Sequence, residues 1–93
     1  MSFILRGSVI ESDTGFSVAV IGQGRLHYAE GDRSLNIECE PALVPTGLIL
    51  YPRSIRSWSS PHAEEPIDLE TKARIVENIR SAFRFSGFEI DVL

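Results

Sequence analysis

Apolar and polar residues alternate over much of the first half of the chain, which is the pattern of β-strands. Residues 3–11 are short and β-rich, residues 25–30 alternate, and residues 35–40 place Leu35, Ile37 and Cys39 on one face. Residues 16–21 are almost wholly apolar and predict the most buried strand. Because short turns rich in Gly, Asp and Ser separate these segments, they predict an antiparallel meander.

A fifth strand and one long helix are predicted next. Residues 48–52 are apolar and end at Pro52, and Asp68 is a suitable N-cap for a helix that Gly87 ends in a left-handed conformation. The apolar positions of this helix recur at spacings of three and four: Leu69, Ala73 or the stem of Lys72, Ile75, Val76, Ile79, Ala82 and Phe83. The spacing predicts that one face of the helix is buried.

The last segment, residues 88–93, alternates as a final strand with Phe88, Ile90 and Val92 toward the core. The order of elements predicts an α+β fold, with an antiparallel sheet of about five or six strands and one long helix packed on one face. With 93 residues, the chain fits a single domain spanning residues 1–93.

Composition and charge narrow the function classes. No apolar run is long enough to cross a bilayer, and the start of the chain is unlike a cleavable signal peptide. The single Cys39 predicts a buried thiol in a cytoplasmic protein. A net charge of −4 disfavours nucleic acid and permits a partner with a basic surface.

No residue constellation predicts catalysis, a metal site or a cofactor. Asp13-Thr14-Gly15 resembles an aspartic protease triplet, but Glu11 and Ser12 precede it where apolar residues are expected, so a turn is favoured. The glycines at positions 22 and 24 precede a strand rather than a helix and predict a hairpin turn.

Other titratable residues have simple structural interpretations. A nucleophilic pair of Cys39 and His27 is conceivable across neighbouring strands but has no orienting third residue. His62 is expected in a solvated loop near acidic residues, and Glu38 and Glu40 on the outward face of a strand.

The stretch "YPRSIRSWSSP", residues 51–61, holds the only Trp of the chain. Tyr, Trp and Arg are enriched at binding hot spots, so Tyr51, Arg53, Arg56 and Trp58 are candidates for contact with a partner. For Trp58 the alternative is a structural one, in which its ring closes the gap between the sheet and the start of the helix.

The chain from Leu50 onward also resembles a known family. A strand ending in Tyr51 is followed by "SIRSW", an acidic loop, "PID", the helix "KARIVENIRSAF" and the strand "GFEIDVL", and "LRGSVIES" near the start is similar too. This layout resembles the small immunity proteins of bacterial polymorphic toxin systems, in particular the family numbered seventy-four. The resemblance implies a non-catalytic cytoplasmic protein that binds and neutralises a cognate toxin.

Three hypotheses follow from these observations. The first is an immunity protein whose interface uses Tyr51, Arg53, Arg56, Trp58, Glu64 and Glu65. The second is a general interaction module that forms a homodimer through an exposed strand edge. The third is a small hydrolase that uses Asp13 or the pair of Cys39 and His27.

Overall fold

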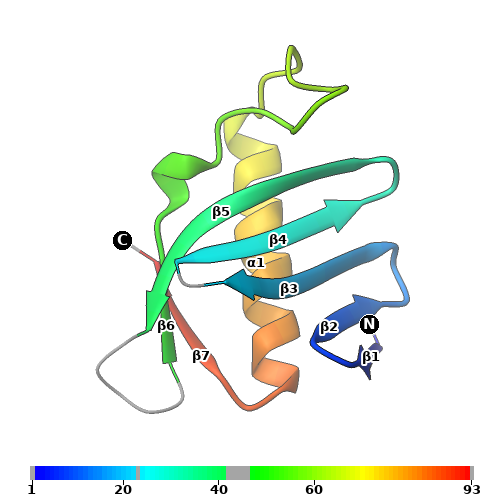
Figure 1. Ribbon diagram of the computed structural model, residues 1–93, viewed down its shortest axis with the longest axis vertical. Coiled ribbons are helices and arrows are strands. Elements are labelled where there is room, and N and C mark those ends of the chain that lie inside the picture. The colour runs from blue at the N-terminus through cyan, green and yellow to red at the C-terminus, as the bar shows by residue number, and fades with distance from the viewer. Residues whose placement is uncertain (1, 23, 42–46, 93) are drawn as a thin grey trace.

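The chain folds as a curled sheet that wraps around one long helix (Figure 1). The structure is a computed structural model and describes residues 2–22, 24–41 and 47–92. Its elements are β1 (Phe3–Arg6), β2 (Val9–Ser12), β3 (Phe16–Gly22), β4 (Arg25–Glu30), β5 (Arg33–Pro41), β6 (Gly47–Leu50), the short 3₁₀ helix η1 (Pro52–Ser54), α1 (Leu69–Phe85) and β7 (Glu89–Val92). This α+β arrangement confirms the predicted fold class.

Within the described residues the sheet has seven strands in the order of the sequence, from β1 to β7. The prediction of five or six strands was therefore slightly low. Residues 3–11 form a hairpin rather than one strand, because Gly7 adopts the left-handed conformation at φ 59° and reverses the chain between β1 and β2. Each pair of neighbours is antiparallel except β6 and β7, which are parallel because α1 carries the chain back between them.

Helix α1 begins and ends as its sequence predicts. The Asp68 side chain accepts a hydrogen bond of 2.8 Å from the Thr71 N–H. Hydrogen bonding with the Thr71 side chain, and then with its N–H, lowers the pKa of the Asp68 carboxyl. Gly87 has a φ of 86°, and the Phe88 N–H donates to the Phe83 carbonyl over 2.8 Å, so the last turn is closed by a left-handed residue.

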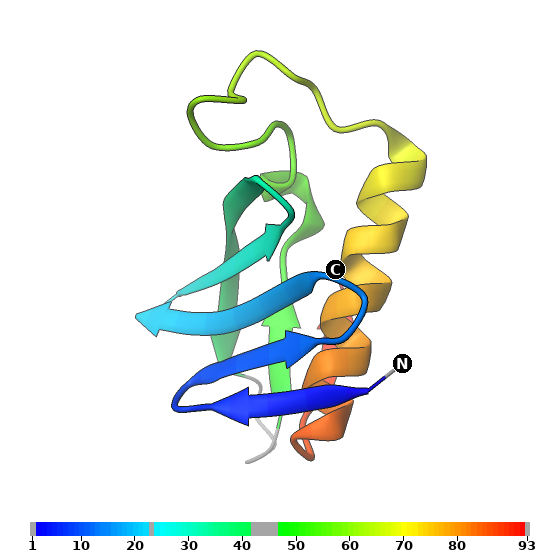
Figure 2. The same cartoon turned by 90° about the vertical axis from the view of Figure 1, so that its right-hand side faces the viewer.

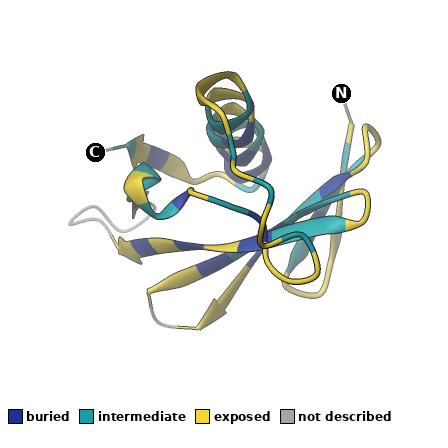
Figure 3. Cartoon of the chain, turned by 90° about the horizontal axis from the view of Figure 1, so that it is seen from above, coloured by how far each residue is buried: buried dark blue, intermediate teal, exposed yellow. Residues whose placement is uncertain are grey.

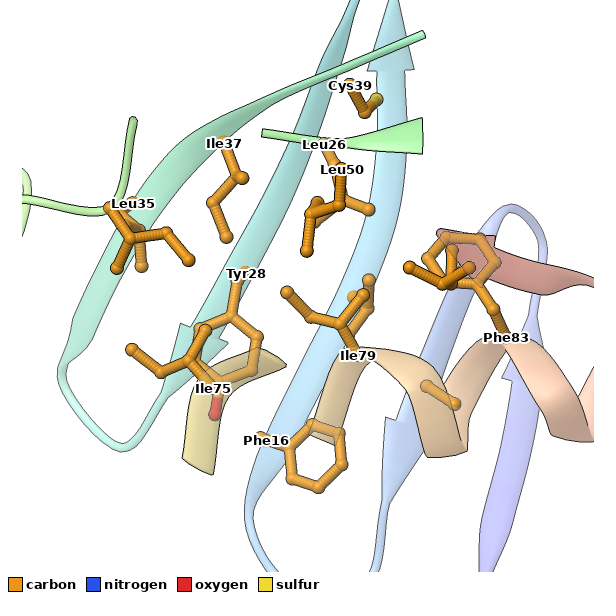
Figure 4. Close-up of a cluster of buried hydrophobic side chains, with 14 of the residues drawn as sticks. Phe16, Leu26, Tyr28, Leu35, Ile37, Cys39, Leu50, Ile75, Ile79 and Phe83 are labelled. Carbon is orange, nitrogen blue, oxygen red and sulfur yellow. The ribbon is translucent and has the colours of Figure 1, made fainter. Parts of the chain in front are cut away.

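The helix packs on the concave face of the sheet, and the two surfaces form one core (Figure 3). Its buried residues are Ile75, Ile79, Ala82 and Phe83. Figure 4 shows Ile75 and Ile79 against Tyr28 of β4 and Leu50 of β6. Cys39 is also buried here, as predicted, and burial raises the pKa of its thiol.

Tyr28 is the one core side chain here whose polar end reaches the helix. Its ring is fully buried, and its hydroxyl accepts a hydrogen bond of 3.0 Å from the Asn78 amide nitrogen. Burial raises the pKa of Tyr28 to about 12. The bond satisfies a hydroxyl that would otherwise be costly in an apolar interface, and it fixes the position of the helix along the sheet.

Two of the predicted core positions, Leu69 and Phe88, are wrong. Leu69 is 83% exposed because α1 leans away from the sheet at its N-terminal end (Figure 2). One turn later Ala73 is exposed, whereas Lys72, the alternative, is half-buried. Phe88 precedes β7 and is also exposed, although its ring packs edge-on against Phe83 at 6.2 Å.

Strand β3 is apolar along most of its length, but only its first half is largely buried. Val18 and Ala19 are buried, but Val20 and Ile21 are exposed where the strand reaches its turn. The register between β3 and β4 shifts between Val20 and Gly22, at the same end of the hairpin. Gln23, in the predicted hairpin turn, and Leu93, in the predicted last strand, lie outside the described residues.

Trp58 closes one end of the core, as its structural interpretation predicts. It is 6% exposed and belongs to the same buried cluster as Ile55, Leu35 and Ile75. Across the described ranges no helix has the length and apolar character that a membrane crossing needs.

Replacing Trp58 by Ala should lower the free energy of unfolding by about 3–5 kcal/mol, the usual cost of deleting a buried aromatic side chain. Urea unfolding followed by circular dichroism measures the change. Leu69→Ala is the control, because Leu69 is the most exposed large apolar residue described and its loss should cost less than about 0.5 kcal/mol. Equal losses for the two variants would contradict the role of Trp58 in the core.

Candidate functional site

Residues 51–59, called the covering segment from here on, run along the edge of β5. Strand β6 pairs only with the last three residues of β5, from Cys39 to Pro41. The Tyr51 N–H donates to the Glu38 carbonyl over 3.0 Å, and the Ser59 N–H donates to the Ser34 carbonyl over 2.7 Å. The covering segment therefore satisfies the part of β5 that β6 leaves open.

Ser54 ties the middle of the covering segment to β5. Its hydroxyl accepts a hydrogen bond of 3.0 Å from the Glu38 N–H and donates one of 2.7 Å to the Tyr51 carbonyl. The same turn is held by the Ile55 N–H, which donates to the Pro52 carbonyl over 2.9 Å. Because Pro52 favours the first turn of such a helix, the local sequence accounts for η1.

The covering segment turns its apolar side chains inward and its arginines outward. Ile55 and Trp58 are buried, whereas Arg53 and Arg56 are exposed and Tyr51 is half-buried. The Arg56 Nε donates to the Arg53 carbonyl over 3.1 Å, and the Arg53 guanidinium lies 5.4 Å from the centre of the Tyr51 ring. These contacts hold both guanidinium groups close to the sheet.

The two arginines meet a third one from β4 at a shallow hollow of about 420 Å³. We call it the arginine hollow, and its lining is Arg25, Asn36, Ile37, Glu38, Arg53, Ser54 and Arg56. Arg25 reaches it because it lies opposite Glu38 in the register of β4 and β5. The sequence analysis missed Arg25, although its place at the start of a hairpin strand could have indicated this pairing.

Charge at the arginine hollow is incompletely balanced. Among the described residues, neither Arg25 nor Arg53 nor Arg56 forms a salt bridge. The nearby Tyr51 hydroxyl donates a hydrogen bond to the Glu40 carboxylate, and this bond raises the pKa of Tyr51. Three guanidinium groups around one hollow, with the Glu38 carboxylate among them, can bind carboxylates of a partner through paired hydrogen bonds.

A second hollow, of about 540 Å³, lies near the start of α1 and has a different charge balance. Its lining is Thr14, Gly15, Glu30, Gly31, Asp32, Arg33, Trp58, Thr71 and Arg74. Both of its arginines are neutralised: Arg74 pairs with Glu30 at 2.5 Å, and Arg33 pairs with Glu65 at 2.8 Å and Asp32 at 3.1 Å. This hollow therefore offers less free charge to a partner than the arginine hollow does.

The two acidic residues of the predicted site, Glu64 and Glu65, have different surroundings. Glu65 is engaged within the chain, since it accepts hydrogen bonds from Arg33 and contacts His62 Nδ1 at 2.6 Å. The bonds from Arg33 lower the pKa of Glu65, and Glu65 in turn raises the pKa of Arg33. His62 is half-buried between Glu65 and Asp32 rather than solvated. Glu64 is exposed.

The catalytic alternatives find little support in the geometry. His27 lies opposite Asn36 on the outer face and contacts it at 2.9 Å, whereas Cys39 is buried on the inner face. Asp13-Thr14-Gly15 forms a turn, with Gly15 at a φ of 102°. In the ranges that the structure describes, no group of three His, Cys, Asp or Glu side chains is arranged to hold a metal ion.

Ser54→Ala should lower the free energy of unfolding by about 1 kcal/mol, because it leaves the Glu38 N–H without its acceptor. Hydrogen exchange at the Glu38 amide should quicken in the same variant. Ser59→Ala is the control, since it removes a hydroxyl but keeps the backbone bond to Ser34. If exchange at Glu38 were unchanged in Ser54→Ala, the hydrogen bond that ties the covering segment to β5 would be disproved.

The ion pair of Glu65 predicts a stability that falls in acid. The folded pKa of Glu65 lies below its ordinary value of 4.5, so the stabilisation is complete above that pH and is lost as pH falls through the folded pKa. Glu65→Gln should therefore be less stable than the parent near pH 7, and the difference should narrow below about pH 4. Unfolding midpoints in urea measure this difference.

The matched control for that experiment is Glu64→Gln, which removes the same charge from an exposed neighbour. Its stability should follow the parent at each pH. A gap between Glu65→Gln and the parent that stays constant with pH would argue against the ion pair.

Comparison with known proteins identifies the family. A family model described as Immunity protein 74 matches residues 18–93, which include the covering segment, the helix and every strand from β4 onward. No curated protein and no solved structure matches the chain significantly. Since the match spans well over half of the sequence, the chain belongs to the Immunity protein 74 family.

Proposed function

We propose that this protein neutralises a cognate toxin of a bacterial polymorphic toxin system by binding it through the arginine hollow and the adjoining covering segment. The single observation that carries the proposal is the set of Arg25, Arg53 and Arg56 around one hollow, without salt bridges among the described residues. Membership of an immunity protein family supports a protein as the partner.

The chemistry of the hollow favours a folded protein over other ligands. Arginine and tyrosine contribute strongly to protein interfaces because they combine a large contact area with polar ends. Both Arg53 and Arg56 are exposed, but their backbone is fixed: Arg53 lies in η1, and the Arg56 carbonyl accepts a hydrogen bond of 2.9 Å from the Ile67 N–H. Little backbone ordering is therefore needed when a partner binds. The net charge of −4 opposes a polyanion such as nucleic acid.

The surroundings of the hollow indicate which surface the toxin presents. Carboxylates of the toxin would enter between the three arginines, and basic groups around them would face Glu38 and Glu40, which are exposed. Such a mixed pattern fixes the orientation of the complex and rejects partners of uniform charge. The overall negative charge then speeds association with a toxin whose surface is mainly basic.

In this proposal Trp58 and Glu65 act indirectly. Trp58 is buried and supports the covering segment from below, and Glu65 is held by Arg33 and His62. Tyr51, Arg53, Arg56 and Glu64 are the predicted residues that have free surface for contact. The protein acts in the cytoplasm without catalysis, by occluding the toxin, which agrees with a single thiol that has no partner for a disulfide within the chain.

The first experiment tests the function itself. Where a neighbouring gene encodes a large secreted protein, the C-terminal domain of that protein is expressed with and without the chain. Rescue of growth together with co-purification of the two proteins is the expected result. Growth arrest in both cases, with no complex on purification, would disprove the proposed function.

Arg53→Ala combined with Arg56→Ala should weaken toxin binding at least about tenfold, because two arginines of the interface are lost. Isothermal titration calorimetry measures the dissociation constant. The control is Arg80→Ala with Arg84→Ala on α1, which removes the same charge from two residues that do not line the hollow. If both double variants bind equally, the arginine hollow does not contact the toxin, even if neutralisation itself is confirmed.

A further inference from the structure

The outer edge of β1 is an open end of the sheet. The order of strands places β1 at one end and β7 at the other, and Figure 2 shows β1 at the far edge from β5. No strand in the described ranges pairs with the outer side of Phe3–Arg6. An open edge exposes backbone donors and acceptors that another strand can pair with.

The register of the hairpin shows which backbone groups point outward. The Asp13 N–H donates to the Ser2 carbonyl over 2.9 Å, so Ser2 directs its backbone groups toward β2. Because these directions alternate in an antiparallel pair, Ile4 and Arg6 also face β2. The N–H and carbonyl groups of Phe3 and Leu5 therefore point to the open side.

The side chains of β1 are unusually apolar for an exposed edge. Ile4 and Leu5 are 56% and 57% exposed and lie on opposite faces of the strand. Phe3 stacks at 5.5 Å on Phe85, which is itself exposed at the end of α1. The one charge on the strand, Arg6, is paired with Glu11 at 3.0 Å. Both faces of the edge can therefore gain by burial.

The opposite edge of the sheet is protected against self-association. Strand β7 carries Glu89 and Asp91, which are both exposed. Two copies of β7 placed side by side would bring like charges together, and this is a common device that keeps sheet edges apart. Strand β1 lacks this protection, which distinguishes it as the edge that can accept another strand.

We propose that two copies of this chain associate through their β1 strands, antiparallel about a twofold axis at Ile4. The geometry is self-complementary, since this register sets Phe3 of each copy opposite Leu5 of the other and makes about four backbone hydrogen bonds. Ile4 then meets Ile4 of the second copy on one face. On the other face Phe3, Leu5 and Phe85 of both copies form one apolar row.

A second copy fits this edge because its own Ile4, Leu5 and Phe85, which are exposed in the single chain, are the apolar side chains that the edge can bury. The edge is only four residues long, so the contact is smaller than the roughly 1,200 Å² of a stable interface. The dimer is therefore weak and depends on concentration. It leaves the arginine hollow, on β4, β5 and the covering segment, free for the toxin.

Sedimentation equilibrium of the full chain from about 10 μM to about 1 mM, a range that brackets weak association, tests the proposal. The average mass should rise from 10.3 kDa toward twice that value. Leu5→Lys should weaken association at least tenfold, because it places a charge in the apolar row. Leu69→Lys is the matched control, since it makes the same change at another exposed leucine and should leave association unchanged.

Hydrogen exchange gives a second measurement that does not depend on a variant. Protection of the Phe3 and Leu5 amides should increase with protein concentration, whereas the Ile4 and Arg6 amides should be equally protected at each concentration. A constant monomer mass with unprotected Phe3 and Leu5 amides would overturn the proposal. The edge would then be open to pairing with a strand of the toxin. Since neither measurement includes the toxin, failure here is distinct from failure of neutralisation.

Discussion

The packing of α1 on the concave face of the sheet is the constraint on which the rest of the structure depends. Ile75, Ile79, Ala82 and Phe83 are the buried residues of the helix, and they share one apolar core with the inner face of the sheet. The hydrogen bond between Asn78 and Tyr28 gives this apolar contact a fixed position. The parallel pairing of β6 and β7 follows, because the helix must cross the sheet between them.

The covering segment connects this core to the candidate site. Ile55 and Trp58 are buried in the same cluster as α1. The N–H groups of Tyr51 and Ser59 donate to β5, and the Ser54 hydroxyl accepts from it, which attaches the segment to the strand. A segment whose one regular element is the short helix η1 is thus attached to the sheet edge that it covers. This attachment places the backbone of Arg53 and Arg56 beside β5, with the Arg56 side chain bonded to the Arg53 carbonyl.

Family membership and the geometry of the hollow support the same kind of function from different directions. The Immunity protein 74 match includes the whole covering segment but not the β1 strand. The arginine hollow lies within the matched residues, whereas the proposed contact between two copies lies outside them. The proposed toxin-binding surface and the proposed contact between two copies therefore lie on separate parts of the sheet.

The sequence by itself determined most of the local structure. Alternation identified the strands, Asp68 and Gly87 marked the helix ends, and Cys39 was placed on a buried face, because each of these properties depends on neighbours in the chain. Only the tertiary structure decided how far burial extends. Leu69 and Ile21 have the composition of core residues, but they lie where the helix and sheet no longer face each other.

The candidate site, too, was predicted in part from the sequence and decided in part by the tertiary structure. The arginines and Tyr51 were visible in one short stretch, but Arg25 joins them only through the register of β4 and β5, and Glu65 leaves them for Arg33, which is 32 positions away. Local pattern cannot encode such pairings, because they depend on which distant segments the packed helix and sheet bring together.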